Sequence, residues 1–303
     1  MTETVSIRLR SNVGRRFPRG FVPRIAPAGI TLLVMVVILL ICELMEPRAL
    51  STIGLTLIFS SIVPIVFASL AQMAIMSVGD IDLGIGAFIG LVVAYVIVGA
   101  LVQLRKVPAL IATLGASFVW LGIGLTFLPT PGGEPPQWLL AYASWAPPLI
   151  PVPVVVVVLA AVLVWMLVQR TGWGTRVRAL GSNPVALARS GTSLLFTRMG
   201  AYALAGVLGI LGGLALSGQI ASGDVNSSSD YTLVSVAAVI LGGGTFFGGR
   251  AGVWGTLFGA TTLGLLTVLL TLLNLPSTLQ PAIQGAIVFL ALAGRLLVEK
   301  VVK

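Results

Sequence analysis

Charged residues are scarce in this 303-residue sequence: 9% of the residues are Asp, Glu, Lys or Arg, whereas 57% are hydrophobic. Soluble domains carry about 25% charged residues, so this composition excludes an ordinary soluble domain. The mean hydropathy of +1.08 points the same way. We therefore predict an all-α polytopic membrane protein, with the lipid bilayer as its surroundings.

Histidine is absent, and Cys42 is the single cysteine. These absences exclude an internal disulfide, a His/Cys metal site and a Ser–His or Cys–His catalytic pair. The sequence also has no glycine-rich phosphate loop that ends in GK[ST], so the chain cannot hydrolyse ATP by the P-loop route. We predict a non-catalytic chain without a cofactor of its own. An intramembrane enzyme that works with carboxylates alone stays open as an alternative.

The net charge of +9 does not indicate nucleic-acid binding. The basic residues lie at the ends of apolar runs and are not interleaved with aromatic residues, a pattern typical of membrane topology. We therefore expect no nucleic-acid partner.

Nine apolar runs of about 17 to 28 residues are long enough to cross a bilayer as helices. They lie at about 25–45, 52–78, 84–104, 108–128, 149–168, 199–216, 231–247, 253–273 and 281–297. Residues 25–298 thus form the predicted membrane domain. It is flanked by a basic tail at 1–24 and a short tail at 299–303.

Between two of these runs, residues 170–198 form a polar loop with five arginines and no acid. Lys and Arg in short loops are held on the cytoplasmic side, so we place this loop inside. Within it, Asn183 can cap a short helix over 185–190, Pro184 suits its first position and Gly191 can end it. Such a helix could dock on a soluble partner, or the loop could simply set the topology.

The same rule places Arg105, Lys106, Arg250 and both chain termini in the cytoplasm. An even number of spans must then separate the N-terminal tail from Arg105, but we count three runs there. One run is re-entrant, one terminus breaks the rule, or the chain lacks a helix that its relatives have.

Asp80 and Asp82 are the acids most closely flanked by apolar runs on both sides. A carboxylate within the membrane is a candidate for ion coupling or substrate contact. Because Gly79 and Gly84 bracket the pair, the carboxylates could instead cap the helix that follows.

Small residues recur every three or four positions in the last third of the chain, a spacing that favours close helix packing. The predicted packing glycines are Gly209, Gly213, Gly244, Gly248, Gly252, Gly255 and Gly259.

Four stretches together resemble the permease subunits of bacterial ATP-binding-cassette importers, in the branch of ribose-type and other monosaccharide permeases. They are 79–87 (GDIDLGIGA), 107–115 (VPALIATLG), 179–191 (ALGSNPVALARSG) and 241–256 (LGGGTFFGGRAGVWGT). Branched-chain amino-acid permeases are more distantly similar. The sequence departs from the family pattern at Asp80, where glycine is usual, and at Gly84, where serine is usual.

The resemblance implies a bacterial inner-membrane protein that works in a complex. Two permease subunits form the path, a periplasmic binding protein delivers a monosaccharide, and separate ATPase subunits bind ATP and Mg²⁺. The residues implied in coupling to the ATPase are Arg178, Asn183, Pro184, Val185, Ala186, Leu187, Ala188, Arg189, Ser190 and Gly191. The family has about ten spans, so a helix is expected to be missing near Val92 and Val93.

Two other functions stay open. An ion-coupled secondary transporter would use Asp80 or Asp82, and a branched-chain amino-acid importer would use the same permease architecture for another solute.

Overall fold

The computed structural model describes residues 26–84, 92–145, 147–245, 248–249, 251–276 and 278–301. Within these ranges the chain is helical and has no strand beyond one isolated bridge. The helices are α1 (Ala26–Met45), α2 (Thr52–Ser77), α3 (Val92–Arg105), α4 (Ala109–Phe127), α5 (Gln137–Ser144), α6 (Val152–Arg170), α7 (Gly172–Ser182), α8 (Pro184–Arg189), α9 (Leu194–Ile220), α10 (Asp230–Leu241), α11 (Val253–Leu272) and α12 (Gln280–Val301). This confirms the predicted all-α polytopic membrane fold.

Each of the nine apolar runs corresponds to a helix, although the helices differ in length. In the described part of the chain, six are long and apolar enough to cross a membrane: α1, α2, α4, α6, α9 and α11. The apolar parts of α3, α10 and α12 are shorter.

The run expected at 231–247 ends early, because α10 stops at Leu241. Gly242 to Gly244 follow it, and Gly243 has a φ of +98°, which glycine adopts freely but other residues do not. Two helices were not predicted at all. The helix α5 lies in the loop after α4, and α7 occupies the first half of the arginine-rich loop.

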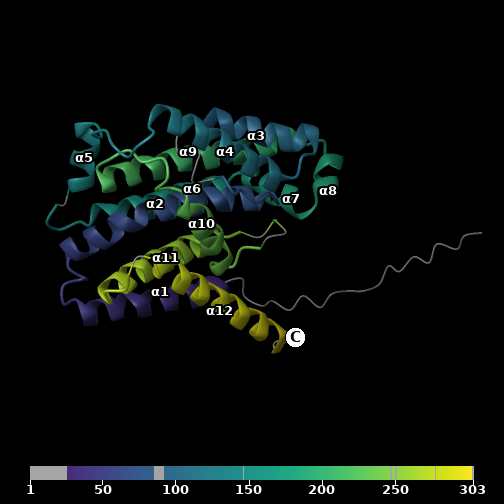
Figure 1. Cartoon of the computed structure of the whole chain (residues 1–303). Coiled ribbons are helices and arrows are strands. Elements are labelled where there is room, and N and C mark those ends of the chain that lie inside the picture. Colours follow the sequence, from purple (N-terminus) through teal and green to yellow (C-terminus); the bar gives the residue numbers. More distant parts are fainter. Residues whose placement is uncertain are drawn as a thin grey trace, which may run out of the picture.

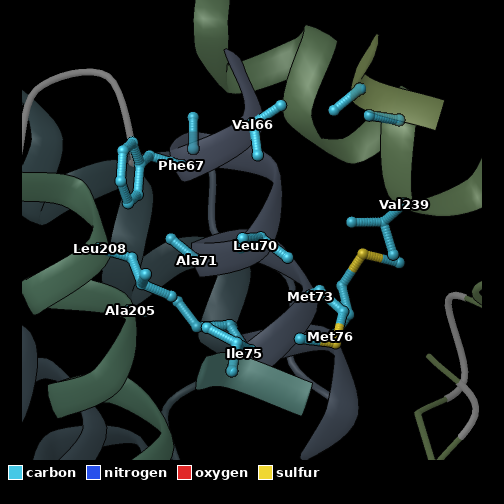
Figure 2. Packing of buried hydrophobic residues seen from close by; sticks show 14 of the residues in the cluster. Val66, Phe67, Leu70, Ala71, Met73, Ile75, Met76, Ala205, Leu208 and Val239 are labelled. Atoms are coloured by element: carbon cyan, nitrogen blue, oxygen red, sulfur yellow. The ribbon is translucent and has the colours of Figure 1, made fainter. Parts of the chain in front are cut away.

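The core is built around α2, which packs against α6, α9, α10 and α11. Its second half is buried almost without interruption, from Ile62 to Val78. Figure 2 shows Ala205 and Leu208 of α9 against one side of α2, and Val239 of α10 near Met73 and Met76. Pro64 lies inside α2, which continues through it as one helix.

The two ends of the bundle differ in charge. The helices α7 and α8 lie at one end and α5 lies at the other (Figure 1). We call the first the basic end: a cavity there is lined by Lys106 and Arg198 together with Pro184 of α8. We call the second the acidic end: the loop that holds Glu134 is joined to the loop that holds Asp224 by the bridge between Gly132 and Gly223.

Both α2 and α3 end at the basic end, and the residues directly after α2 turn back towards it. The N–H of Asp80 donates to the carbonyl of Ile75 at 3.3 Å. The backbone of Asp82 then meets the side-chain amide of Gln72, at 3.1 and 3.2 Å in the orientation that satisfies both groups. Residues 78–84 thus fold back along α2, and the helix start expected after Gly84 lies outside the described residues.

Candidate functional site

The short helix α8 has the cap and the limits that its sequence predicts. The side chain of Asn183 accepts a hydrogen bond from the N–H of Ala186 at 3.0 Å, and Pro184 takes the first helical position. After Arg189 the chain turns at Gly191, whose φ is +76°.

One face of α8 is anchored and the others are free. Leu187 is 7% exposed and Val185 is 58% exposed. The other residues from Asn183 to Ser190 are also exposed, including Arg189. The helix therefore presents an apolar side chain and a cation at the basic end of the bundle.

The helix α7 comes directly before α8 in the chain and is bonded to α6. Thr171 caps it by accepting a hydrogen bond from the N–H of Gly174 at 3.1 Å. Arg178, one of the predicted coupling residues, donates to the carbonyl of Val168 in the last turn of α6. Its guanidinium thus connects α7 to α6, whereas Arg189 faces outward.

Three elements far apart in the sequence meet at the end of α7. A Cβ on Gly181 would collide with the carbonyl of Ser77 and the N–H of Gly249, and a Cβ on Gly248 would lie 2.5 Å from the Cα of Gly79. The N–H of Gly249 also donates to the carbonyl of Ser77 at 3.3 Å. Only residues without side chains allow this approach. We call the contact of Gly79, Gly181 and Gly248 the glycine junction.

Asp80 lies beside the glycine junction and faces α9. Its Oδ2 lies 3.2 Å from Nε of Arg198, and the two groups form an ion pair. The N–H bond of Nε does not point at this oxygen, so the contact is not a hydrogen bond. The Tyr202 hydroxyl donates to the same oxygen, also at 3.2 Å. The side chains of Arg198 and Asp80 are 17% and 9% exposed, so the pair is largely removed from water.

Asp82 is fully buried and is held by different partners. Its Oδ1 accepts from the N–H of Gly84 at 2.6 Å, and its Oδ2 accepts from the hydroxyl of Tyr95 on α3 at 2.9 Å. The N–H of the neighbouring Leu83 donates to the hydroxyl of Thr113 on α4 at 3.2 Å. The segment is therefore tied to α2, α3 and α4.

The sequence indicated Asp80 and Asp82 but none of their partners. Gln72, Tyr95, Thr113, Arg198 and Tyr202 come from four different helices. All but Arg198 are polar within an otherwise apolar run, which is the signal that would have singled them out; Arg198 is the last residue of the arginine-rich loop. The carboxylate of Asp80 is bonded to Arg198 and Tyr202 of α9. The helix that Asp80 or Asp82 was expected to cap would begin outside the described residues.

A cavity of about 300 Å³ opens between the turn joining α3 to α4 and the start of α9. Asp80 and Arg198 line it with Lys106, whose φ of +53° places it in a left-handed turn. One carboxylate and two cations therefore share this space. In the described part of the chain, no three acids, His or Cys gather to hold a metal ion.

The predicted packing glycines differ in their surroundings. Gly255 and Gly259 of α11 lie directly against the backbone of α10, and Gly244 lies against Val239. Gly248 belongs to the glycine junction. Gly252, by contrast, has open space where its Cβ would be, so packing does not require glycine there.

Gly209 and Gly213 are both buried in α9. Gly212, which was not among the predicted packing glycines, also lies against α2, since its Cβ would lie 3.2 Å from Cβ of Phe67.

At the acidic end, Asp224 organises its own loop. The hydroxyl of Ser227 and the N–H of Asn226 donate to its carboxylate. These hydrogen bonds lower the pKa of Asp224 below its usual value. The carboxylate therefore keeps its charge at neutral pH.

A bundle with six helices long and apolar enough to cross a membrane, counted in the described part of the chain, defines a multi-pass membrane protein. The chain belongs to the family described as "Branched-chain amino acid transport system / permease component", whose model matches residues 121–292.

The chain is similar to several import permeases. It is 33% identical over 196 residues to the ribose import permease protein RbsC of Bacillus subtilis, covering 64% of this chain and 61% of that protein. It is 30% identical over 239 residues to the galactose/methyl galactoside import permease protein MglC of Salmonella typhimurium, covering 75% and 69%. It is 34% identical over 140 residues to the fructose import permease protein FrcC of Rhizobium meliloti, covering 46% and 39%. No solved structure matches the chain.

Proposed function

We propose that this chain is the membrane-spanning permease subunit of an ATP-binding-cassette importer for a monosaccharide. The family description names amino acids, but the relatives described above are named for the import of ribose, galactose and fructose. The match spans 61% of the Bacillus subtilis permease, so the solute and the partners are inferred from a partial likeness.

The observation that carries the proposal is the exposure of α8. A helix of six residues with its own cap, anchored through Leu187 and exposing Val185 and Arg189, suits docking on another protein. We propose that it docks on an ATPase subunit in the cytoplasm, and that this partner binds ATP and Mg²⁺. The permease itself then performs no catalysis.

This orientation places the basic end and both chain termini in the cytoplasm of a bacterium, with the protein in its inner membrane. The acidic end then faces a periplasmic binding protein that delivers the sugar. A second permease subunit, identical or related, completes the path.

An ion-coupled secondary transporter is the weaker alternative. Asp80 already has Arg198 as its counter-ion, and Asp82 accepts hydrogen bonds from Tyr95 and Gly84. A carboxylate that couples transport to H⁺ or Na⁺ needs to release its partner in each cycle. The existing partners of Asp80 and Asp82 oppose such a release.

Uptake into proteoliposomes tests the proposal. The chain is reconstituted with its cognate ATPase and binding protein, and labelled ribose, galactose and fructose are supplied one at a time. We expect uptake of one of them that requires ATP and stops when the ATPase carries an inactivated phosphate loop. Uptake that persists with the inactive ATPase and collapses when the proton or sodium gradient is dissipated would instead establish the secondary transporter.

A further inference from the structure

The docking helix α8 is joined to α9 by a short, ordered connection. Ser190 donates to the carbonyl of Leu187 at 2.7 Å, and its hydroxyl lies 3.2 Å from that of Thr192. Ser193 then caps α9 by accepting from the N–H of Phe196 at 3.4 Å. Four residues, 190–193, separate the two helices. This short connection joins α8 directly to the first turn of α9.

The first turns of α9 hold Asp80 from two positions one turn apart. Arg198 makes the ion pair and Tyr202 donates the hydrogen bond, both to Oδ2 at 3.2 Å. In the part of the chain that the structure describes, this is the one ion pair. It connects α9 to residue 80 across more than a hundred residues of sequence.

Asp80 in turn belongs to a segment that is bonded to three other helices. Gln72 of α2 holds the backbone of Asp82, Tyr95 of α3 holds its carboxylate, and Thr113 of α4 holds the N–H of Leu83. The rings of Tyr95 and Tyr202 also lie 6.4 Å apart. Movement of Asp80 is thus transmitted to α3 and α4.

A largely buried ion pair is poor evidence of a purely stabilising role, because removing both charges from water costs about as much as their attraction returns. Such a pair does, however, hold its two side chains together in one geometry.

We propose that the Asp80–Arg198 ion pair is the link through which displacement of α8 by the ATPase reaches residues 78–84 and, through them, α3 and α4. Arg198 and Asp80 are positioning residues in this scheme: neither needs to touch the ATPase or the sugar. The inference rests on the proposed function and names the connection by which that function would be driven.

The test compares sugar imported per ATP hydrolysed, in the reconstituted complex and with the sugar that the wild-type complex imports. The main variant is the double neutral change Asp80→Asn with Arg198→Gln, which removes both charges together and so leaves neither of them unpaired. We expect it to assemble and to keep its basal ATPase rate, while sugar imported per ATP falls about ten-fold. Arg198→Lys, which keeps the charge, should retain part of the coupling.

Arg105→Gln is the matched control, because it removes an exposed charge from the last turn of α3 at the same end. It should import sugar with the wild-type ratio. The inference is overturned if the double neutral variant has the wild-type ratio. It is also overturned if that variant fails to assemble, since the pair would then be a structural requirement. If the wild-type chain itself imports no sugar with the ATPase, the proposed function fails and this inference falls with it.

Discussion

At the basic end, the end of α2, the end of α7 and the turn before α11 meet through backbone at Gly79, Gly181 and Gly248. At the acidic end, two loops meet through one pair of backbone hydrogen bonds, between Gly132 and Gly223, each 3.0 Å long. The first contact has no space for a side chain at Gly181 or Gly248. The second has space at Gly132, although a Cβ on Gly223 would lie 3.0 Å from Leu128 and 3.2 Å from the carbonyl of Gly132. Backbone therefore packs against backbone at the basic end, whereas at the acidic end two loops are joined by a pair of hydrogen bonds.

The largest expected effect comes from placing a methyl group in the glycine junction. In Gly181→Ala the new Cβ meets rigid backbone on both sides, so we expect the free energy of unfolding to fall by about 3 kcal/mol. Gly132→Ala at the acidic end has room and should cost less than about 0.5 kcal/mol. Denaturant unfolding in detergent measures both.

Gly172→Ala serves as the control within α7 itself, because nothing lies within 4 Å of its Cβ position. If Gly181→Ala costs no more than this control, the glycine junction does not hold the basic end together.

A smaller loss of stability is expected when only one partner of the buried ion pair loses its charge. Asp80→Asn keeps the shape of the side chain but leaves the Arg198 guanidinium unpaired. We expect a loss of about 2 kcal/mol, less than for a fully buried pair because Arg198 keeps some access to water. The measurement is again denaturant unfolding, with Arg105→Gln as the exposed reference. Equal stability of the two variants would mean that the pair contributes nothing to the basic end.

The smallest expected loss of stability comes from removing a helix cap at either end of the bundle, and the two variants should differ in function. Asn183→Ala removes the cap of α8, and Ser51→Ala removes the cap of α2 at the opposite end, where Ser51 accepts from Gly54 at 3.1 Å. Each should cost about 1 kcal/mol. We expect Asn183→Ala alone to weaken association with the ATPase, measured by co-purification. Equal association of the two variants would argue against docking through α8.

Much of the fold was predictable from the sequence, because long apolar runs permit few structures in a membrane. The nine runs became nine helices, and Asn183, Pro184 and Gly191 set the limits of α8 as local capping rules require. Coupling through α8 and Arg189 stays a prediction, as does the helix expected to be missing near Val92.

What the sequence did not predict depends on contacts between distant segments. Nothing local to Asp80 indicates Arg198, which lies on another helix, and nothing local to Gly181 indicates that Ser77 and Gly249 press against it. The helix α7 was missed because it is short and not apolar overall, and its arginines resemble those of a solvated loop. Gly252 was included for its spacing, although spacing does not say which face of a helix meets a neighbour.

The most direct test of the central claim is co-purification, in detergent, of this chain with its cognate ATPase for the wild type, Arg189→Glu and Glu134→Lys. Both variants reverse one exposed charge, the first on α8 at the basic end and the second in the loop at the acidic end. We predict that the wild type and Glu134→Lys retain the ATPase and that Arg189→Glu loses it. Retention of the ATPase by Arg189→Glu, or its loss in Glu134→Lys, would contradict docking at the basic end.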